Sequence, residues 1–223
     1  MSTFAGVRAV LFDLDGTLID SAPDLAGAAN ALRESRGLPP LPLTSYRAHC
    51  GSGARGMLRV AFGIEPGHEA FEELKQQFFA EYQTRLTLST QAFEAVDRLL
   101  NVLAEAGLPW GVVTNKSERF TAPLMQAMPL FEGAATVISG DTTPHAKPHP
   151  APLLEAARRI GLPSTSCVYV GDDQRDMQAG RAAGMRTVAA LYGYLGHGAD
   201  VAAWEADAMI SSPLDLLKCL GLP

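Results

Sequence analysis

The sequence predicts an α/β protein in which a block of helices interrupts a parallel sheet after its first strand. From residue 91 onward, short apolar runs of the kind that form buried strands alternate with amphipathic helical segments. This alternation implies a parallel sheet covered on both faces. Residues 43–86, in contrast, contain no convincing strand. At 223 residues the chain can bury one substantial core and add a small second module.

The first strand is predicted at Ala9–Phe12, an apolar run that Gly16-Thr17 breaks. Ser21-Ala22-Pro23-Asp24 then predicts a helix start, with the serine as N-cap, the proline in the first turn and the aspartate at the capping-box position. We expect this helix to reach about Ser35, because the Gly- and Pro-rich residues 37–42 stop it.

Helices alone are predicted in residues 43–86, where Phe71, Leu74, Phe78, Phe79 and Tyr82 form an apolar stripe at helical spacing. The elements expected after Gln91 are a helix ending at Gly107, a strand at Trp110–Val113, a helix at Ser117–Met128, a strand at Thr136–Ser139, a helix closed by Gly161, a strand at Cys167–Val170, a helix to Ala183, a strand at Arg186–Leu191 and a last helix near Pro213–Leu220. The chain thus predicts a five-stranded parallel sheet.

Two carboxylates follow the first predicted strand. Asp13 and Asp15 stand at its carboxyl end, where open α/β sheets bind ligands, and residues two apart on an extended chain point the same way. Two like charges at ~4 Å repel by roughly 4 kcal/mol at an effective dielectric of about 20, so the pair needs a cation, a shared proton or wide separation. An ordinary acidic turn is the simpler alternative. A calcium loop of the EF-hand type is excluded, because Gly16 is fourth from Asp13 rather than sixth.

Groups suited to phosphoryl transfer follow several of the predicted strands. In chain order they are Asp13/Asp15, Thr114/Asn115, Lys147 and Asp172/Asp176. Strand ends converge on one edge of a parallel sheet, so we expect these groups to meet there. The hydroxyl, amide and ammonium are donors for phosphate oxygens, and clustered carboxylates are ligands suited to Mg²⁺.

Two further motifs have alternative interpretations. Gly51-Ser52-Gly53-Ala54-Arg55-Gly56 spells the dinucleotide pattern GxGxxG, but the preceding residues 45–50 are polar and do not form the buried strand that such a site needs. Free backbone N–H groups at a helix start near Ala54, with Arg55 beside them, would instead suit an anion, and a plain helix–helix turn remains open. Residues 172–176 spell the DDxxD of prenyl-diphosphate enzymes, but those enzymes have an all-helical fold, whereas here a predicted strand and Gly171 lead directly into the motif, which argues against that activity.

The composition limits the partners. The net charge is −6 and the 18 Lys and Arg residues are scattered, which argues against nucleic acid. Cys50, Cys167 and Cys219 lack disulfide or zinc spacing and predict reduced thiols. No apolar run approaches the ~18 residues of a membrane span, and no signal-peptide layout is present. We therefore expect a cytoplasmic protein that acts on a small molecule, with its oligomeric state left open.

Taken together, the motifs resemble those of a haloacid dehalogenase (HAD) superfamily phosphatase, of the subfamily that contains phosphoglycolate phosphatases. They stand in this chain as Asp13-Leu14-Asp15-Gly16-Thr17, Val113-Thr114-Asn115, Lys147-Pro148 and Gly171-Asp172-Asp173-Gln174-Arg175-Asp176. The resemblance covers the whole chain. It implies a HAD-like Rossmannoid α/β core formed by residues 1–18 and 87–223, with an inserted α-helical cap at residues 19–86.

The resemblance also implies roles. Asp13 would be the nucleophile that forms an aspartyl-phosphate, and Asp15 the acid for the leaving oxygen and later the base for water. A reaction divided into formation and hydrolysis of an aspartyl-phosphate requires one ionised and one proton-carrying carboxylate. Thr114 and Lys147 would hold the phosphoryl group, and Gly16, Thr17, Asn115 and Arg55 would bind substrate. Mg²⁺ would be held by the Asp13 side chain, the Asp15 carbonyl and Asp172, with Asp176 supporting the metal site from nearby. Asp173 departs from the Ser or Thr of many relatives, and we expect it to cap the next helix.

Two substrate branches compete. The general pattern is similar to phosphoglycolate phosphatases, which is the leading expectation. Ser52-Gly53-Ala54-Arg55, Trp110–Lys116, Gly171–Asp176 and Tyr192-Gly193-Tyr194 also resemble the branch that dephosphorylates N-acetylmuramic acid 6-phosphate in bacterial cell-wall recycling. Both esters contain a carboxylate, which Arg55 would suit. A phospho-acceptor signalling domain or a sugar-phosphate mutase are alternatives of other classes, although receiver modules are about half this length and lack a cap.

Overall fold

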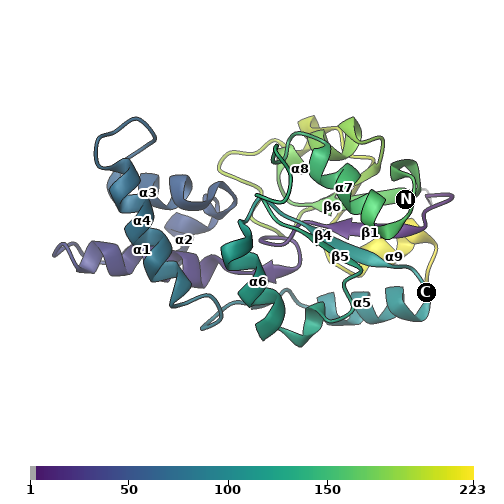
Figure 1. The fold of residues 1–223 in the computed structure, drawn as a ribbon, viewed down its shortest axis with the longest axis horizontal. Coiled ribbons are helices and arrows are strands. Elements are labelled where there is room, and N and C mark those ends of the chain that lie inside the picture. Colours follow the sequence, from purple (N-terminus) through teal and green to yellow (C-terminus); the bar gives the residue numbers. More distant parts are fainter. Residues whose placement is uncertain (1–3) are drawn as a thin grey trace.

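A computed structural model describes residues 4–223 and contains a six-stranded parallel sheet in the order β5-β4-β1-β6-β7-β8 (Figure 1). The strands are β1 (Ala9–Phe12), β4 (Trp110–Val113), β5 (Thr136–Ile138), β6 (Cys167–Gly171), β7 (Arg186–Ala190) and β8 (Ala208–Ile210). Five of them were predicted from the sequence. The edge strand β8 was not, because the short run Ala208-Met209-Ile210 follows no helical segment that would have indicated another crossover.

Helices cover both faces of the sheet, as the alternating pattern predicted. They are α5 (Val96–Glu105), α6 (Glu118–Ala127), α7 (Ala151–Ile160), α8 (Gln174–Ala182) and α9 (Asp215–Leu220). Side chains of β1 alternate between the two faces: Val10 and Phe12 enter the core beneath α5 and α9, whereas Ala9 and Leu11 enter the core beneath α7 and α8. All four are fully buried, so β1 is the centre of the fold.

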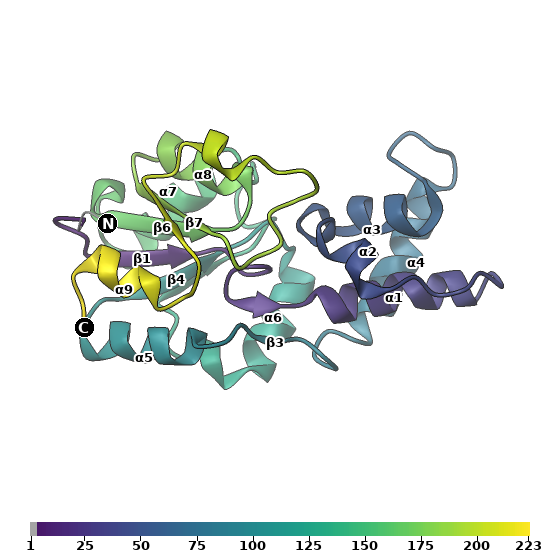
Figure 2. The same cartoon turned by 180° about the vertical axis from the view of Figure 1, so that it is seen from behind.

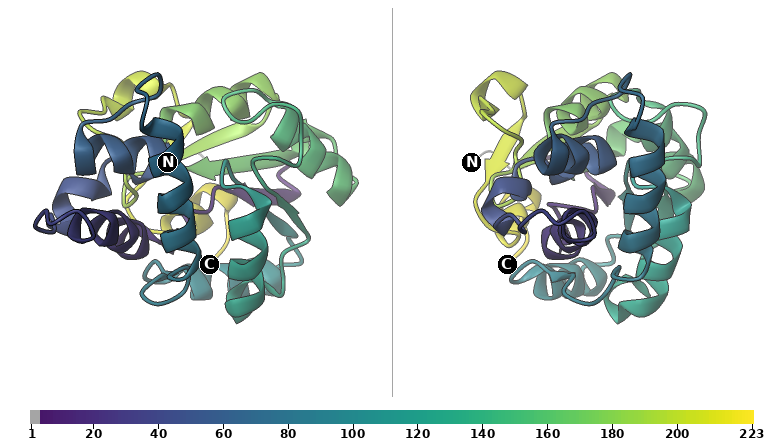
Figure 3. Two further views of the ribbon diagram at one scale, coloured as in Figure 1. Left: turned by 60° about the vertical axis from the view of Figure 1, so that its left-hand side comes forward. Right: turned by 90° about the vertical axis from the view of Figure 1, so that its left-hand side faces the viewer.

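A second group of helices lies beyond one end of the sheet (Figures 1 and 2). It consists of α1 (Ala22–Glu34), α2 (Leu43–Arg47), α3 (Gly53–Phe62) and α4 (Phe71–Gln83), which pack on one another. In Figure 3, which brings this side forward, α4 lies alongside α6, and the rings of Phe79 and Phe120 join the two helices at 5.3 Å. The helical block and the sheet thus face each other across a seam.

Both chain crossings between the two parts are extended. β2 (Ile19–Asp20) pairs in antiparallel fashion with β3 (Gln91–Ala92). The helical insert was expected to begin at Ile19, and this two-stranded ribbon was not predicted, because two-residue strands leave no periodic signal. The predicted division into residues 1–18 and 87–223 against 19–86 stays a prediction, and its first three residues lie outside the described part of the chain.

The capping box predicted at the start of α1 was wrong. The Ser21 side chain makes no capping hydrogen bond, and its hydroxyl donates to Asp15 instead. The Asp24 carboxylate accepts hydrogen bonds from the backbone N–H groups of Ser89 and Thr90, at 3.0 and 2.8 Å. Both side chains therefore bind partners outside the helix: Ser21 binds the nearby Asp15, and Asp24 binds residues 65 and 66 positions away. No helix within residues 4–223 is long and apolar enough to cross a membrane.

Candidate active site

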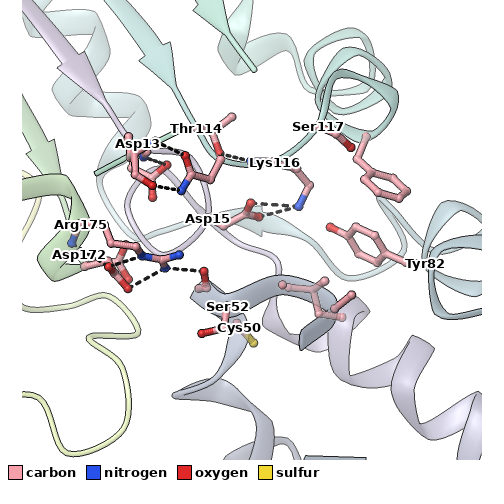
Figure 4. Close-up of a pocket in the computed structure, with 18 of the residues that line it drawn as sticks. Asp13, Asp15, Cys50, Ser52, Tyr82, Thr114, Lys116, Ser117, Asp172 and Arg175 are labelled. Carbon is pink, nitrogen blue, oxygen red and sulfur yellow. Dashed lines mark hydrogen bonds and ion pairs between the residues drawn. The ribbon is translucent and has the colours of Figure 1, made fainter. Parts of the chain in front are cut away.

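A cavity of about 310 Å³ lies between the carboxyl ends of the strands and the helical block (Figure 4). Its core-side lining includes the predicted Asp13, Asp15, Thr114, Asn115, Lys147, Asp172 and Asp176. Its opposite lining comes from α1, from residues 50–54 and from α4. The polar groups that were predicted to converge at the carboxyl edge of the sheet therefore do lie around one cavity.

Lys147 is the charged centre of the core side. Its ammonium lies 2.8 Å from an oxygen of Asp13 and 2.8 Å from an oxygen of Asp176. It also donates to the Val113 carbonyl at 2.9 Å and to the Tyr169 hydroxyl at 2.7 Å. Burial acts to lower the pKa of Lys147, but the two carboxylates outweigh it and raise that pKa. Lys147 is therefore a fixed cation between two acids.

Three carboxylates are crowded together at this point. Asp13, Asp172 and Asp176 each offer an oxygen within 4.8 Å of the others. Burial raises the pKa of Asp13 to about 7, with Lys147 acting against it and Asp176 adding to it. Burial and the charges of Asp13 and Asp176 raise the pKa of Asp172 well above its usual value. A divalent cation would relieve this repulsion, and buried carboxylate oxygens are the ligands that Mg²⁺ prefers, so the residues fit such an ion.

Gly16 and Thr17 hold Asp172 in place. The Thr17 hydroxyl donates to one oxygen of Asp172 at 3.2 Å, and the backbone N–H of Tyr194 donates to the other at 2.7 Å. Gly16 has a φ of +89°, and a Cβ there would lie 2.2 Å from the Asp172 carboxylate. Only glycine therefore allows the first motif to lie directly against the fourth.

Asp15 faces away from this acidic group and toward Lys116, which the sequence analysis did not identify as a site residue. The Lys116 ammonium lies 3.0 Å from both Asp15 oxygens, and the Ser21 hydroxyl also donates to Asp15. Burial acts to lower the pKa of Lys116, but Asp15 and Tyr82 raise it. One signal was available in the sequence: Lys116 stands two residues after Thr114, so an extended chain would point both side chains the same way.

Two predicted substrate-binding residues occupy positions that the sequence did not foresee. The side-chain amide of Asn115 donates to the Lys147 carbonyl and accepts from the Lys147 N–H, both at 2.9 Å, so it joins the second motif to the third. Arg55 is exposed and is not among the residues that line the cavity. The neighbouring residues 51–54 line it instead, immediately before and at the start of α3.

Asp173 caps α8, as expected. Its side chain accepts from the backbone N–H of Arg175 at 2.9 Å, and Asp176 completes a capping box by accepting from the Asp173 N–H at 3.1 Å. The Arg175 guanidinium pairs with Asp173 and donates to the Gly51 carbonyl at 2.6 Å. The fourth motif thus reaches across the seam to the helical block.

A parallel sheet with an acidic cluster at its carboxyl edge, opposed by a helical insert after the first strand, defines a class of α/β hydrolases with a separate covering module. The chain belongs to the haloacid dehalogenase-like hydrolase family, whose model matches residues 10–190. The resemblance drawn from the four motifs is therefore confirmed. The protein is a phosphoric monoester hydrolase of this family.

Individual relatives are similar over nearly the whole chain. A phosphoglycolate phosphatase of Xanthomonas campestris is 46% identical over 97% of both chains. An N-acetylmuramic acid 6-phosphate phosphatase of Pseudomonas putida is 40% identical over 96% of both chains. The crystal structure of a predicted phosphoglycolate phosphatase from Haemophilus somnus superposes with a TM-score of 0.84 at 29% identity, covering 96% of this chain and 98% of that one.

Proposed function

We propose that the protein hydrolyses phosphate monoesters through an aspartyl-phosphate on Asp13. The observation that supports this most strongly is the position of Lys147, whose ammonium lies 2.8 Å from Asp13 at the end of the central strand. A fixed cation keeps the Asp13 carboxylate oriented, and it stabilises negative charge on a phosphoryl group transferred to that carboxylate. The Thr114 hydroxyl, which is also buried in the cavity wall, would hold a second phosphoryl oxygen.

Asp13, Asp172 and Asp176 would hold Mg²⁺, together with the backbone carbonyl of Asp15. When bound, the ion would neutralise the crowded carboxylates and polarise the phosphoryl group. Thr17 and Tyr194 would keep Asp172 oriented toward it by the hydrogen bonds already described.

Asp15 would transfer protons. It would give one to the leaving oxygen as Asp13 attacks phosphorus, and would then remove one from the water that releases phosphate. Its side chain stands at the same cavity as Asp13 and is only 15% exposed. Lys116 and Ser21 fix the direction in which its carboxylate points.

The substrate we propose is a small carboxylated phosphate ester of the phosphoglycolate type, hydrolysed in the cytoplasm with the helical unit of residues 19–86 acting as the cap that selects it. The most similar relatives described above include a phosphoglycolate phosphatase. N-acetylmuramic acid 6-phosphate is a second candidate, because the cavity is walled by the rings of Phe78, Phe79, Tyr82 and Phe120. Such rings would cover the apolar face of a sugar, which a two-carbon acid lacks.

The test is kcat/KM measured with Mg²⁺ for 2-phosphoglycolate and N-acetylmuramic acid 6-phosphate side by side. A hundredfold preference, or ~2.7 kcal/mol of differential transition-state binding, would assign the substrate. Phosphate release separates hydrolysis from the two other classes. A stable aspartyl-phosphate without turnover would indicate a phospho-acceptor domain, and isomerisation of a sugar phosphate without net phosphate release would indicate a mutase.

A further inference from the structure

Tyr82 presents an unsatisfied hydroxyl at the seam between the two parts. The residue lies on α4, lines the cavity and is 2% exposed. Within residues 4–223 its buried hydroxyl hydrogen has no acceptor, because the one group beside the oxygen, the Lys116 ammonium, can only donate to it. A buried polar group without a partner costs free energy, so a residue with this environment indicates a ligand that would supply the missing bond. Figure 4 shows the hydroxyl on the side of the ring that faces Lys116.

Lys116 lies next to this hydroxyl on the core side. Its side chain is 7% exposed, and its ammonium stands 4.8 Å from the centre of the Tyr82 ring. An ammonium has three N–H donors, and the Lys116 ammonium lies 3.0 Å from both oxygens of Asp15. Because an ammonium accepts no hydrogen bond, the hydroxyl hydrogen of Tyr82 finds no acceptor there either. Two buried donors therefore stand side by side.

The surroundings of these donors are aromatic. Phe120 lies 5.2 Å from Tyr82 and Phe79 lies 5.3 Å from Phe120, measured between ring centres. Rings of this kind contribute no acceptor of ordinary strength, so the complement to the two donors must come from the ligand. They also exclude water, which strengthens a charge-assisted hydrogen bond formed beside them.

We propose that the Tyr82 hydroxyl and the Lys116 ammonium form a subsite for a carboxylate on the leaving group of the phosphate ester. This inference rests on the proposed hydrolysis. A carboxylate has two acceptor oxygens and a negative charge, which matches one hydroxyl donor beside one ammonium donor. An ester without the carboxylate would leave both donors without an acceptor. A site built to hydrogen-bond a substrate group strongly rejects analogues that lack this group. Tyr82 is then a specificity-determining residue, and it has the carboxylate-binding role that was expected of Arg55 from the sequence.

The experiment compares pairs of esters that differ at the carboxylate. One pair is 2-phosphoglycolate and ethylene glycol monophosphate, and the other is N-acetylmuramic acid 6-phosphate and N-acetylglucosamine 6-phosphate. The quantity measured is the ratio of kcat/KM between the two members of a pair. We expect the wild-type ratio to favour the carboxylated ester at least tenfold in the pair that the enzyme accepts, and Tyr82→Phe to lower that ratio at least fivefold.

Tyr46→Phe is the matched control, because it removes a hydroxyl from the same helical block at a side chain that donates to Asn30 outside the cavity. We expect it to leave the ratio unchanged. A wild-type ratio near one would overturn the proposal, and so would a ratio that Tyr82→Phe leaves unchanged. An equal loss on both members would overturn it too, since that is the result of a purely structural role.

Calorimetry separates this proposal from the hydrolase function. The Asp13→Asn variant, titrated in Mg²⁺ with both members of a pair, reports binding without turnover. If the wild type hydrolyses neither ester, the proposed function fails, but a binding preference that Tyr82→Phe removes would still support the subsite. Equal binding of both members would overturn the subsite even if hydrolysis is observed.

Discussion

The two walls of the cavity are built on different principles. On the core side, Lys147 touches Asp13, Asp176, Val113 and Tyr169, and each oxygen of Asp172 has its own donor. On the helical side the lining consists of Leu25, residues 50–54 and the rings of Phe78, Phe79 and Tyr82, and the hydroxyl hydrogen of Tyr82 has no acceptor within residues 4–223. A wall held by several ion pairs and hydrogen bonds has a fixed geometry, as the reaction requires. A mostly apolar wall with few polar contacts leaves its contacts to the ligand. Under the functions proposed above, the reaction would belong to the core side, and the choice of substrate would depend on contacts from both sides, through Tyr82 and Lys116.

The largest expected effect comes from the core wall. Asp13→Asn removes the nucleophile while keeping nearly the same volume, so we expect kcat to fall by at least ~10³-fold with the fold intact. Phosphate release measures the fall in kcat, and far-ultraviolet circular dichroism checks that the fold is intact. Asp97→Asn, at an exposed position on α5, is the control. Substantial residual turnover would contradict the nucleophile assignment.

Asp15 stands where the two walls meet, and its loss should depend on the leaving group. Asp15→Asn removes the proton donor, so we expect kcat for an alkyl phosphate to fall ~10²-fold or more. p-Nitrophenyl phosphate has a good leaving group that needs little protonation, and its kcat should fall much less. Equal losses on the two esters would mean that Asp15 supports the site in another way.

Metal binding should depend on pH through the core wall. The pKa of Asp13 is raised to about 7 by burial, so the metal-free protein holds this residue protonated below pH 7 and loses stability as the pH rises toward that value. A cation needs the ionised form. We therefore expect the Mg²⁺ dissociation constant to fall about 25-fold from pH 5.5 to pH 7.5, as measured by calorimetry, and the Mg²⁺-induced rise in Tm to grow with it. A pH-independent dissociation constant would place the metal elsewhere.

The smallest effect is expected from the helical side, at Arg55. This side chain is exposed and outside the cavity lining. We expect Arg55→Ala to change kcat/KM for either carboxylated ester less than twofold, since surface substitutions away from a site have small effects. A tenfold loss would show that the helical block moves enough on binding to bring Arg55 to the substrate, and it would restore the role predicted from the sequence.

Much of the core was predictable because its signals are local. Buried strands leave apolar runs, and Asp13, Thr114 and Asp172 each stand directly after one, so the rule that strand ends converge was enough to bring these motifs together. Lys147 lies in the loop after β5 and was placed by its motif. The capping of α8 by Asp173 was predictable for the same reason, since both partners lie within four residues.

The sequence alone thus determined the fold class, the helical insert and the charged edge of the sheet, because apolar periodicity and motif spacing specify each of them within a few residues. Only the tertiary structure decided the partners across the seam. Ser21 left its cap for Asp15, Lys116 joined that carboxylate, and Tyr82 of the apolar stripe came to lie over Lys116. Those contacts join residues up to 101 positions apart, and their energy depends on how helices pack, which no local pattern records.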